Sequence, residues 1–531
     1  MHRGGNALKH DRWNIEPAIF WPTILIFAAV SVGLFVGGDT LFTVLSSLLQ
    51  TLTTRLGWVY LWICIINFIS LGWLAFSKYG SIKFGAPDEK PEYSNFSWTC
   101  MVFTTGIDAS IMIMSLFEPI QYVSAPPFGL EPFSAEAYDY AHMYGQFHWG
   151  PSAWTMYIPA TIAIAYTLFV KRTDTTRISN ACVPASGWLE RHLWARHLLD
   201  VIIVFGIMGG IGASIGLEIP VISRIFHQLT GVADTLGLKF IMLAALLVLF
   251  GSCVYLGLEK GMKWLSSATV YITLGFLVVT LLWGPTSYLI DAETNSIGLL
   301  ASNFVRMSTY TDPHLASGFP QNWTIFYWGW WLAYMPVMGL FVARISRGRT
   351  IRQVICGQVL WGSVGCMTVF GIMGGYALYV QRTGIVDLAG ILATEGQEAA
   401  ITALLSTLPL PQLMLVVYLI SCFVFLATTI SSSAYILSSM TSKKLSGYEN
   451  PARWNRLLWS VVFMLFSAGI MVVGGMETIK LVCVLAGFPL IAVVLLLMRS
   501  IRRMVKTHAD PSFPSASRSE PNGLTAEHTS S

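Results

Sequence analysis

The segment LVCVLAGFPLIAVVLLLM, from Leu481 to Met498, contains no charged side chain and decides the fold class of this chain. Two further apolar runs, PTILIFAAVSVGLFV (22–36) and IMLAALLVLFGSCVYL (241–256), approach the same length. An α-helix needs about 20 residues to cross the roughly 30 Å of hydrocarbon in a bilayer, and these runs reach that length with their flanks. We therefore predict an all-α, polytopic membrane protein.

The composition of the chain supports a lipid environment. Only 11% of the 531 residues are charged, 54% are hydrophobic, and the mean hydropathy is +0.61, whereas soluble domains carry about 25% charged residues. The net charge of +4 is small and its basic residues gather in loops, which excludes a nucleic-acid partner. The eight cysteines include no CxxC pair, so we assign them to packing.

We count about twelve transmembrane helices from apolar length and from the places where charge returns. They lie near 17–37, 57–77, 98–118, 146–170, 198–218, 238–258, 265–284, 323–343, 354–380, 411–440, 456–474 and 478–498. With the amino terminus inside, the inner loops collect residues such as Lys78, Arg172 and Arg349, whereas outer loops hold few basic residues, such as Arg55 and Arg306. This positive-inside asymmetry predicts that both termini are cytoplasmic.

Two spans carry helix-breaking residues at mid-depth, TTGID (104–108) in the third and MPVMG (335–339) in the eighth. Their spacing suggests five-helix units that begin at spans three and eight. In transporters, interrupted helices at corresponding places in two repeats expose backbone groups that hold ions and substrate near the bilayer midplane. The alternative is that Gly and Pro are simply more frequent in membrane helices than in soluble ones.

The eighth span opens with WTIFYWGWWLAY (323–334), which holds four tryptophans and two tyrosines. An aromatic belt at the membrane interface would explain Trp323, but Trp330, Trp331 and Tyr334 lie about two turns deeper. Trp330 and Tyr334 are four residues apart and share one helix face. A cage of aromatic faces attracts a cation that donates no hydrogen bonds, and each face contributes on the order of 0.5 to 2 kcal/mol when water is excluded. Trimethylammonium and dimethylsulfonium groups are cations of this kind.

The fourth span opens with a second aromatic cluster, FHWGPSAWTMY (147–157), which contains Trp149, Trp154 and Tyr157. Alone, this cluster fits an interfacial belt or a packed core equally well. Paired with span eight, it would form the opposite wall of a cage. We interpret the neighbouring His148 as a hydrogen-bonded structural histidine.

Asp108 is the one acid that we place deep in a span. An ionisable side chain at that depth is costly unless it is paired or hydrated, which marks Asp108 as a functional candidate. It would face a substrate cation, help a coupling ion or carry a proton; alternatively, it is solvated in a water-filled cavity next to Gly106. We interpret Glu118, near the outer end of the same span, as structural.

The tenth span contains FLATTISSS (425–433), a run of hydroxyl side chains in apolar surroundings. Hydroxyl and carbonyl oxygens are hard ligands that suit a small cation such as sodium. Ser and Thr also help membrane helices to pack and to form hydrogen bonds with their neighbours. Spacing alone supports both interpretations equally.

The string TIFYWGWW (324–331), continued by ARISRGRTIR (343–352), resembles the signature of the betaine/carnitine/choline transporter family. GLEKG (257–261), PPFGLEP (126–132) and FHW (147–149) are also similar to family sequences, so the resemblance covers the chain from span one to span twelve. It implies a LeuT-like core of two inverted five-helix repeats, often assembled as a homotrimer, in a bacterial inner membrane. The expected parts are a cytoplasmic amino terminus (1–16), two peripheral helices (17–97), a first repeat (98–284), an outer linker (285–322), a second repeat (323–498) and a disordered cytoplasmic tail (499–531).

The resemblance also implies a substrate site between the repeats. Its aromatic box would consist of Trp149, Trp154, Tyr157, Trp330, Trp331 and Tyr334. Tyr334 and Met338 are similar to the carnitine/γ-butyrobetaine antiporter, whereas sodium-coupled betaine carriers have tryptophan at the position of Tyr334. Gln121 replaces a tyrosine that the antiporter places around its substrate. The expected substrate is a quaternary-ammonium or sulfonium zwitterion.

The coupling ion is inferred from the same resemblance. The antiporter fills one sodium position with an arginine early in span seven, where this chain has Thr269. The sodium site implied by the sodium-coupled members consists of Thr104, Ile107, Phe425, Thr428 and Thr429. We therefore favour symport with Na+ as the coupling ion, by alternating access and without a cofactor.

Three alternatives are weighed against this interpretation. A proton-driven choline carrier would use Asp108 as the counter-charge, although choline carriers of the family place their acid two residues later, at the position of Ser110. A sodium-independent carnitine/γ-butyrobetaine exchanger would fit Tyr334 and Met338. A membrane-embedded enzyme is disfavoured because the sequence has no paired-histidine metal spacing and no cluster of intramembrane Asp, Glu and His.

Overall fold

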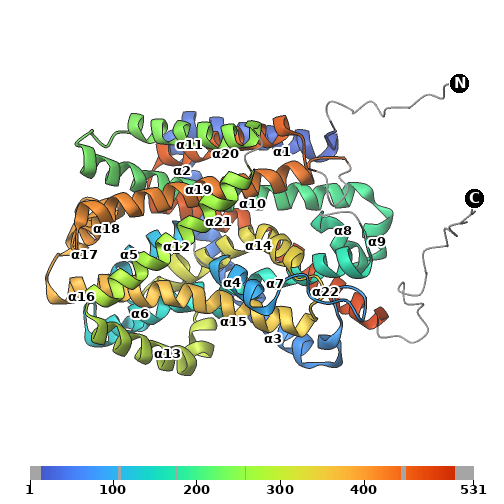
Figure 1. The fold of residues 1–531 in the computed structure, drawn as a ribbon, viewed down its shortest axis with the longest axis horizontal. Helices are drawn as coiled ribbons and strands as arrows, with labels where there is room; N and C mark the ends of the chain where they lie inside the picture. The colour runs from blue at the N-terminus through green and yellow to red at the C-terminus, as the bar shows by residue number, and fades with distance from the viewer. Residues whose placement is uncertain (1–13, 106–108, 174–176, 257–258, 444–449, 509–531) are drawn as a thin grey trace, which may run out of the picture.

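The computed structural model describes residues 14–105, 109–173, 177–256, 259–443 and 450–508, which are built from helices (Figure 1). The described residues form no strand; they include two isolated bridges, Ile15 with Ser442 and Lys83 with Thr350. Within these ranges, nine helical segments are long and apolar enough to cross a membrane, or eleven if each of two bent pairs counts as one span. The all-α, polytopic fold class is therefore confirmed.

The long helical segments follow the order of the predicted spans. They are α1 (Pro17–Val36), α3 (Gly57–Phe76), α4 (Asn95–Thr105) with α5 (Ala109–Ser124), α6 (Ala135–Trp149) with α7 (Pro151–Ala165), α10 (Leu193–Thr230), α11 (Leu236–Leu256), α12 (Glu259–Trp283), α14 (Ile325–Ile345), α15 (Ile351–Val369) with α16 (Gly375–Thr383), α19 (Pro411–Met440), α20 (Arg453–Val473), and α21 (Gly475–Gly487) with α22 (Leu490–His508). The short helices α8 (Ile178–Cys182) and α9 (Gly187–Arg191) lie at one end of the bundle, and α17 (Leu388–Thr394) and α18 (Gln397–Leu405) lie at the opposite end (Figure 1). The number twelve and the inverted repeats stay predictions.

The third span is broken where the sequence predicts a break. α4 ends at Thr105, α5 begins at Ala109, and the two helix axes differ by 53°. The residues between them, including Ile107 and Asp108, lie outside the described part of the chain. Thr105 and Ala109 are therefore the described residues that flank this break.

The eighth span is not broken, and this prediction is wrong. α14 runs without interruption from Ile325 to Ile345, with Pro336 inside it. Neighbouring membrane helices can satisfy the backbone group that a proline frees. Gly339 serves close packing, because a Cβ atom there would lie 2.4 Å from the Cβ of Ala160 in α7.

The fourth span has a break that the sequence analysis missed. Its helical segment begins at Ala135, before the predicted start at residue 146, and Gly150 separates α6 from α7. A Cβ atom on Gly150 would lie 2.3 Å from the carbonyl oxygen of Gln146, so glycine is required at this turn. As a result, Trp149 ends one helix while Trp154 and Tyr157 belong to the next.

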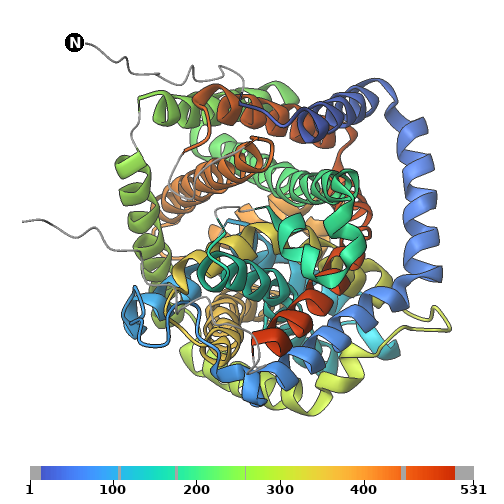
Figure 2. The same cartoon turned by 90° about the vertical axis from the view of Figure 1, so that its right-hand side faces the viewer.

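Three predicted connections or tails contain helices. α2 (Gly38–Arg55) follows α1 and lies at the edge of the bundle (Figure 2). α13 (Thr286–Ser308) occupies the predicted outer linker (285–322) and follows α12 after a bend of 107°. α22 continues to His508 into the tail predicted as disordered, because Ser500 donates a hydrogen bond to the carbonyl of Ala181, at 2.5 Å.

α14 lies in the interior of the bundle. It packs against α7, α10 and α21, and its span is the most completely buried of the candidate spans in the described residues. Gly329 lets α14 approach α21, since a Cβ atom there would lie 2.9 Å from the Cα of Val484. The tyrosines and tryptophans of α14 are therefore buried in protein, whereas Phe341 near its other end is 39% exposed. Trp323, which precedes α14, is only 4% exposed although a lipid interface was considered for it.

Candidate functional site

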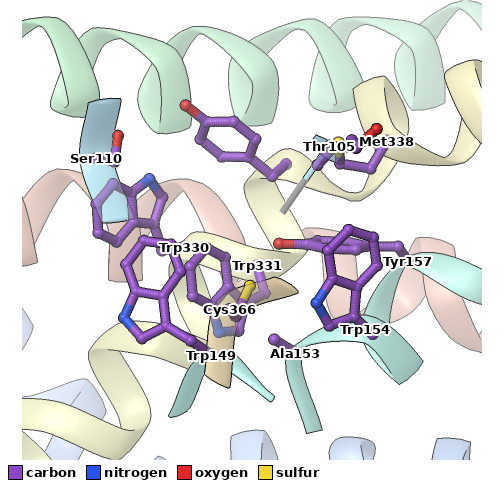
Figure 3. Close-up of a pocket in the computed structure, with 11 residues that line it drawn as sticks. Thr105, Ser110, Trp149, Ala153, Trp154, Tyr157, Trp330, Trp331, Met338 and Cys366 are labelled. Carbon is purple, nitrogen blue, oxygen red and sulfur yellow. The ribbon is translucent and has the colours of Figure 1, made fainter. Parts of the chain in front are cut away.

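A single pocket gathers all six aromatic residues that the sequence proposes for the box. Its lining consists of Thr105, Ser110, Trp149, Ala153, Trp154, Tyr157, Trp330, Trp331, Tyr334, Met338 and Cys366 (Figure 3). About 400 Å³ of empty space lies within it, a figure that includes space open to solvent. We call the six aromatic residues, Trp149, Trp154, Tyr157, Trp330, Trp331 and Tyr334, the aromatic cage.

Two rings of the aromatic cage are nearly parallel, and others stand across them at steep angles. Trp330 and Trp331 are stacked, with ring centroids 5.5 Å apart and planes 5° apart. Trp149 stands across Trp331 at 4.7 Å and 72°, and Tyr157 stands across it from the other side of the break, at 6.2 Å and 84°. All six side chains are buried, so ring faces of different orientation border one water-poor space.

Three of the four indole N–H groups of the cage are bonded to the protein. The Nε1 of Trp331 donates to the carbonyl of His148 at 2.9 Å, and that of Trp330 donates to the carbonyl of Gly210 at 3.3 Å. The Nε1 of Trp149 donates to Oε2 of Glu118 at 3.4 Å. These bonds fix the ring orientations, and they leave the π faces as the main groups that a ligand can contact.

Glu118 lies behind the cage and is fully buried. Tyr122 donates a hydrogen bond to its Oε1, while Tyr327 and Trp149 donate to its Oε2. His148, the predicted structural histidine, is bonded on both sides, with Nδ1 2.7 Å from the hydroxyl of Tyr122 and Nε2 3.0 Å from that of Thr324. Glu118 therefore holds together α5, α6 and α14, which agrees with a structural role and adds a carboxylate next to the cage.

A second carboxylate approaches the cage from α10. Oε1 of the buried Glu218 accepts a hydrogen bond from the hydroxyl of Ser110 at 2.6 Å. One turn earlier on the same face, the hydroxyl of Ser214 lies 2.6 Å from that of Tyr334. The prediction that Asp108 is the one acid deep in a span is therefore wrong, because Glu118 and Glu218 are both buried inside the bundle.

The sequence analysis overlooked a GxSxG string, Gly212 to Gly216, which contains Ser214 and is of the kind that carries the nucleophile of many hydrolases. That chemistry requires a sharp turn between a strand and a helix, whereas here the string lies inside the continuous helix α10. No group of three His, Cys, Asp or Glu side chains that could hold a metal occurs in the described part of the chain. The string therefore serves helix packing, since a Cβ on Gly212 would clash with the ring of Phe466.

The remaining predicted substrate residues are placed as follows. Met338 lines the pocket, whereas Gln121 lies near the end of α5 and is not part of the lining. Asp108 lies outside the described residues, so its distance from the cage stays unassigned. The antiporter has a substrate-contacting tyrosine at this position, and the location of Gln121 outside the pocket lining agrees with the replacement of that tyrosine.

The predicted sodium ligands lie on two elements. The hydroxyl of Thr104 donates to the carbonyl of Cys100 at 2.8 Å, in the last turn of α4. The hydroxyl of Thr428 donates to the carbonyl of Phe425, also at 2.8 Å, and Thr429 follows it on α19. Ile107 lies outside the described residues. The hydroxyls of Thr104 and Thr428 thus each donate within their own helix, which leaves lone pairs of their oxygen atoms available.

The sequence analysis did not place two buried carboxylates, Glu118 and Glu218, beside the cage, although each has a recognisable feature in the sequence. Glu118 and Tyr122 are four residues apart on one helix, a spacing that brings a carboxylate and a phenol together. Glu218 is an acid within an otherwise apolar, glycine-rich helix, which by itself marks a functional position in a membrane protein. The contacts to Tyr327 and Ser110 bridge distant parts of the sequence and have no local signature.

A family model of the betaine/carnitine/choline family transporters matches residues 18–510. The match therefore covers all the described spans and the aromatic cage. Proteins of this family are transporters, which agrees with the many apolar helices of the described residues. The chain is an integral membrane protein that belongs to the betaine/carnitine/choline transporter family.

Proposed function

We propose that this chain is a secondary active transporter that moves a quaternary-ammonium or sulfonium zwitterion, such as glycine betaine or carnitine, by sodium-coupled symport. The observation that carries the proposal is the aromatic cage. Six buried aromatic side chains border one pocket, and the indole N–H groups of three of them are bonded elsewhere. A methylated onium head offers no hydrogen-bond donors, so ring faces are its natural partners.

The proposed sodium site adjoins the cage. Its ligands would be Thr104, the backbone of Ile107, the carbonyl of Phe425, Thr428 and Thr429. Thr104 precedes Thr105, which lines the cage, and α5 packs against α19. Because a helix end leaves carbonyl groups without intrahelical partners, the end of α4 supplies oxygen ligands at the break. An ion at this place would stabilise the same backbone that borders the substrate.

Transport would follow alternating access. The two inverted five-helix repeats of a LeuT-like core would rock around the loaded site, which opens it to one side of the membrane at a time. No covalent chemistry is involved. The assembly proposed from the family resemblance is a homotrimer in a bacterial inner membrane, with both termini cytoplasmic.

The second candidate function is a proton-driven choline carrier, and Glu218 favours it. Its carboxylate is hydrogen-bonded to Ser110, which lines the cage. A carboxylate at this place would balance the charge of a cationic substrate that has no carboxylate of its own. Tyr334 and Met338, which are both in the pocket lining, fit the third candidate, a sodium-independent carnitine/γ-butyrobetaine exchanger.

The test is uptake of labelled glycine betaine, carnitine, γ-butyrobetaine and choline into liposomes that contain the purified protein. The proposal expects accumulation of a zwitterion only when sodium is higher outside than inside. Uptake that instead requires a counter-substrate inside contradicts symport and identifies an exchanger, and uptake of choline driven by a pH gradient identifies the proton-driven carrier.

A matched pair of variants tests the sodium site. Thr428→Val removes a hydroxyl of the proposed site, whereas Thr368→Val removes a hydroxyl with the same kind of intrahelical bond on α15. We expect Thr428→Val to raise the sodium concentration for half-maximal uptake about tenfold, since one ligand is worth roughly 1.4 kcal/mol. Thr368→Val should leave it unchanged, and equal effects of the two variants would contradict the site.

A further inference from the structure

The carboxylate of Glu118 is connected to two walls of the aromatic cage. Its Oε2 accepts hydrogen bonds from the indole of Trp149, at 3.4 Å, and from the phenol of Tyr327. Trp149 is itself a cage residue. Tyr327 lies next to the cage, stacked on Trp331 with ring centroids 5.4 Å apart and planes 25° apart, and on Trp330 at 6.1 Å and 21°. Glu118 therefore contacts Trp149 and Tyr327 without being part of the pocket lining.

Three hydrogen-bond donors around Glu118, Tyr122, Tyr327 and Trp149, favour its ionised form. When the hydroxyl of Tyr122 donates its hydrogen bond to Glu118, Nδ1 of His148 is the donor to the oxygen of Tyr122, at 2.7 Å. Nε2 of His148 then accepts from the hydroxyl of Thr324, at 3.0 Å. In this arrangement the imidazole is neutral, Glu118 is an ionised acceptor of three donors, and every group of the network has a partner. The network as a whole carries one negative charge.

This charge acts on the rings of the cage. An N–H or O–H group that donates to a carboxylate shifts electron density into its own ring, because connected hydrogen bonds polarise one another. The attraction between a ring face and a cation is electrostatic, so a more negative face binds a cation more strongly. The buried position of Glu118 adds to this effect, since charges interact more strongly away from water.

We infer that Glu118 is a positioning residue that, through Trp149 and Tyr327, makes the aromatic cage selective for a positively charged head group over an uncharged group of the same shape. The inference rests on the proposed function, because it takes an onium compound as the ligand. It goes further by assigning the charge selectivity of the cage to a residue that does not line the pocket. Shape and ring contacts alone would accept a tert-butyl group as readily as a trimethylammonium group.

The test compares equilibrium binding of paired probes to purified protein in nanodiscs. One pair is choline and its tert-butyl analogue, and the other is glycine betaine and its tert-butyl analogue, in which carbon replaces nitrogen. Glu118→Gln keeps the size and one acceptor oxygen but removes the charge. We expect it to weaken onium binding on the order of tenfold and to change binding of the tert-butyl analogues by less than about twofold.

Two further variants make the comparison specific. Glu293→Gln neutralises a carboxylate on α13 that accepts a hydrogen bond from Gln146 at 2.6 Å, away from the cage, and it should leave the onium preference as in the wild type. Glu118→Asp keeps the charge but withdraws it from Trp149, and it should lower the preference less than Glu118→Gln. If Glu118→Gln does not give folded protein, the lowered preference in Glu118→Asp carries the test.

Each outcome has a distinct meaning. If the wild type binds no onium probe, the proposed function fails. If the wild type binds onium compounds and the folded Glu118 variants weaken onium and tert-butyl probes by the same factor, Glu118 only supports the shape of the cage and the inference is overturned. A selective loss of onium binding supports it.

Discussion

The aromatic cage and a second cavity, at the end of the bundle near α17 and α18, differ in almost every property. The cage contains about 400 Å³ of empty space and is lined mainly by aromatic rings, with the fully buried Glu118 behind them. The second cavity contains about 780 Å³ and is lined by Arg224, Gln228, Val386, Ile391, Glu395, Ala399, Thr402, Ala403, Ser406 and Thr407. Its charged pair, Arg224 and Glu395, is 3.1 Å apart and partly exposed.

The two cavities therefore suit different roles. In the proposed substrate site, ring faces of fixed orientation would select a cation, and the hydrogen bonds that hold them are between buried groups. In the second cavity, hydroxyls, an amide and an exposed ion pair offer contacts that water can replace, and exposed pairs are worth about 0 to 1 kcal/mol. We therefore expect substitutions in the cage to change affinity and selectivity, and substitutions in the second cavity to change rates slightly.

The largest effect is expected for Trp331→Leu. This change removes the ring that contacts both Trp149 and Tyr157, and it should weaken onium binding about tenfold or more, since one aromatic face contributes up to about 2 kcal/mol. The measurement is equilibrium binding of labelled glycine betaine. Trp62→Leu, a change on the exposed face of α3, is the control. Equal affinities for glycine betaine in the two variants would show that the aromatic cage does not bind the substrate.

Glu218→Gln should change selectivity more than overall activity. The carboxylate reaches the pocket lining through Ser110, so its removal should lower choline uptake relative to glycine betaine uptake about threefold, by loss of a charge interaction at intermediate distance. The measurement is competition between the two substrates in proteoliposomes. A choline to betaine ratio identical to that of the wild type would show that Glu218 acts only on packing.

Arg224→Gln should have a smaller effect. It breaks the ion pair between α10 and Glu395, and we expect the dissociation constant for substrate to stay within about twofold while the maximal uptake rate changes by less than about threefold. Glu395→Gln should reproduce the effect, and the double variant should add nothing to it. A large loss of affinity in Arg224→Gln would place a substrate contact in the second cavity and reverse the comparison.

The smallest effect concerns stability in the loop before α14. Burial raises the pKa of Asp312, but hydrogen bonds from the backbone of Ser317, Gly318 and Ala316 and from the Ser317 hydroxyl hold the pKa below its ordinary value. The pKa of Asp312 is thus lower in the folded than in the unfolded protein. Its negative charge therefore stabilises the fold fully at pH values above the unfolded-state pKa. This stabilisation is lost as the pH falls through the folded-state pKa.

Asp312 has a left-handed backbone conformation, with φ of 48°. Asparagine also adopts this conformation readily, so Asp312→Asn removes the charge without straining the backbone. It should reduce the free energy of unfolding by about 1 kcal/mol at neutral pH, and by less at a pH below the folded-state pKa. The measurement is thermal unfolding of both proteins at the two pH values. A difference between the proteins that grows as pH falls would contradict the assigned direction.

The order of the long apolar helices, and the aromatic residues that share one pocket, could be predicted from the sequence. The spans follow from apolar length, and Trp149, Trp154, Tyr157, Trp330 and Trp331 stand out because aromatic residues are dense within short windows. In contrast, the pair formed by Pro336 and Gly339 has the same local appearance as a break, yet Gly339 fits against Ala160 of another helix. Local sequence does not contain that contact.

The parts that escaped prediction are those that depend on distant pairs of residues. Glu118 meets Tyr327 and Glu218 meets Ser110 only after the helices pack. Glu118 was assigned a structural role because it lies near the end of a span, but the helix α5 continues past it to Ser124. Its position near the end of the predicted span therefore suggested a more exposed carboxylate than the fully buried one in the structure.

The most direct test of the account is the structure of the protein in nanodiscs with saturating glycine betaine, determined by electron cryo-microscopy. The account predicts ligand density inside the aromatic cage, with the trimethylammonium head within about 6 Å of the ring centroids of Trp149, Trp330 and Trp331. An empty cage together with ligand density in the cavity of Arg224 and Glu395 would contradict it.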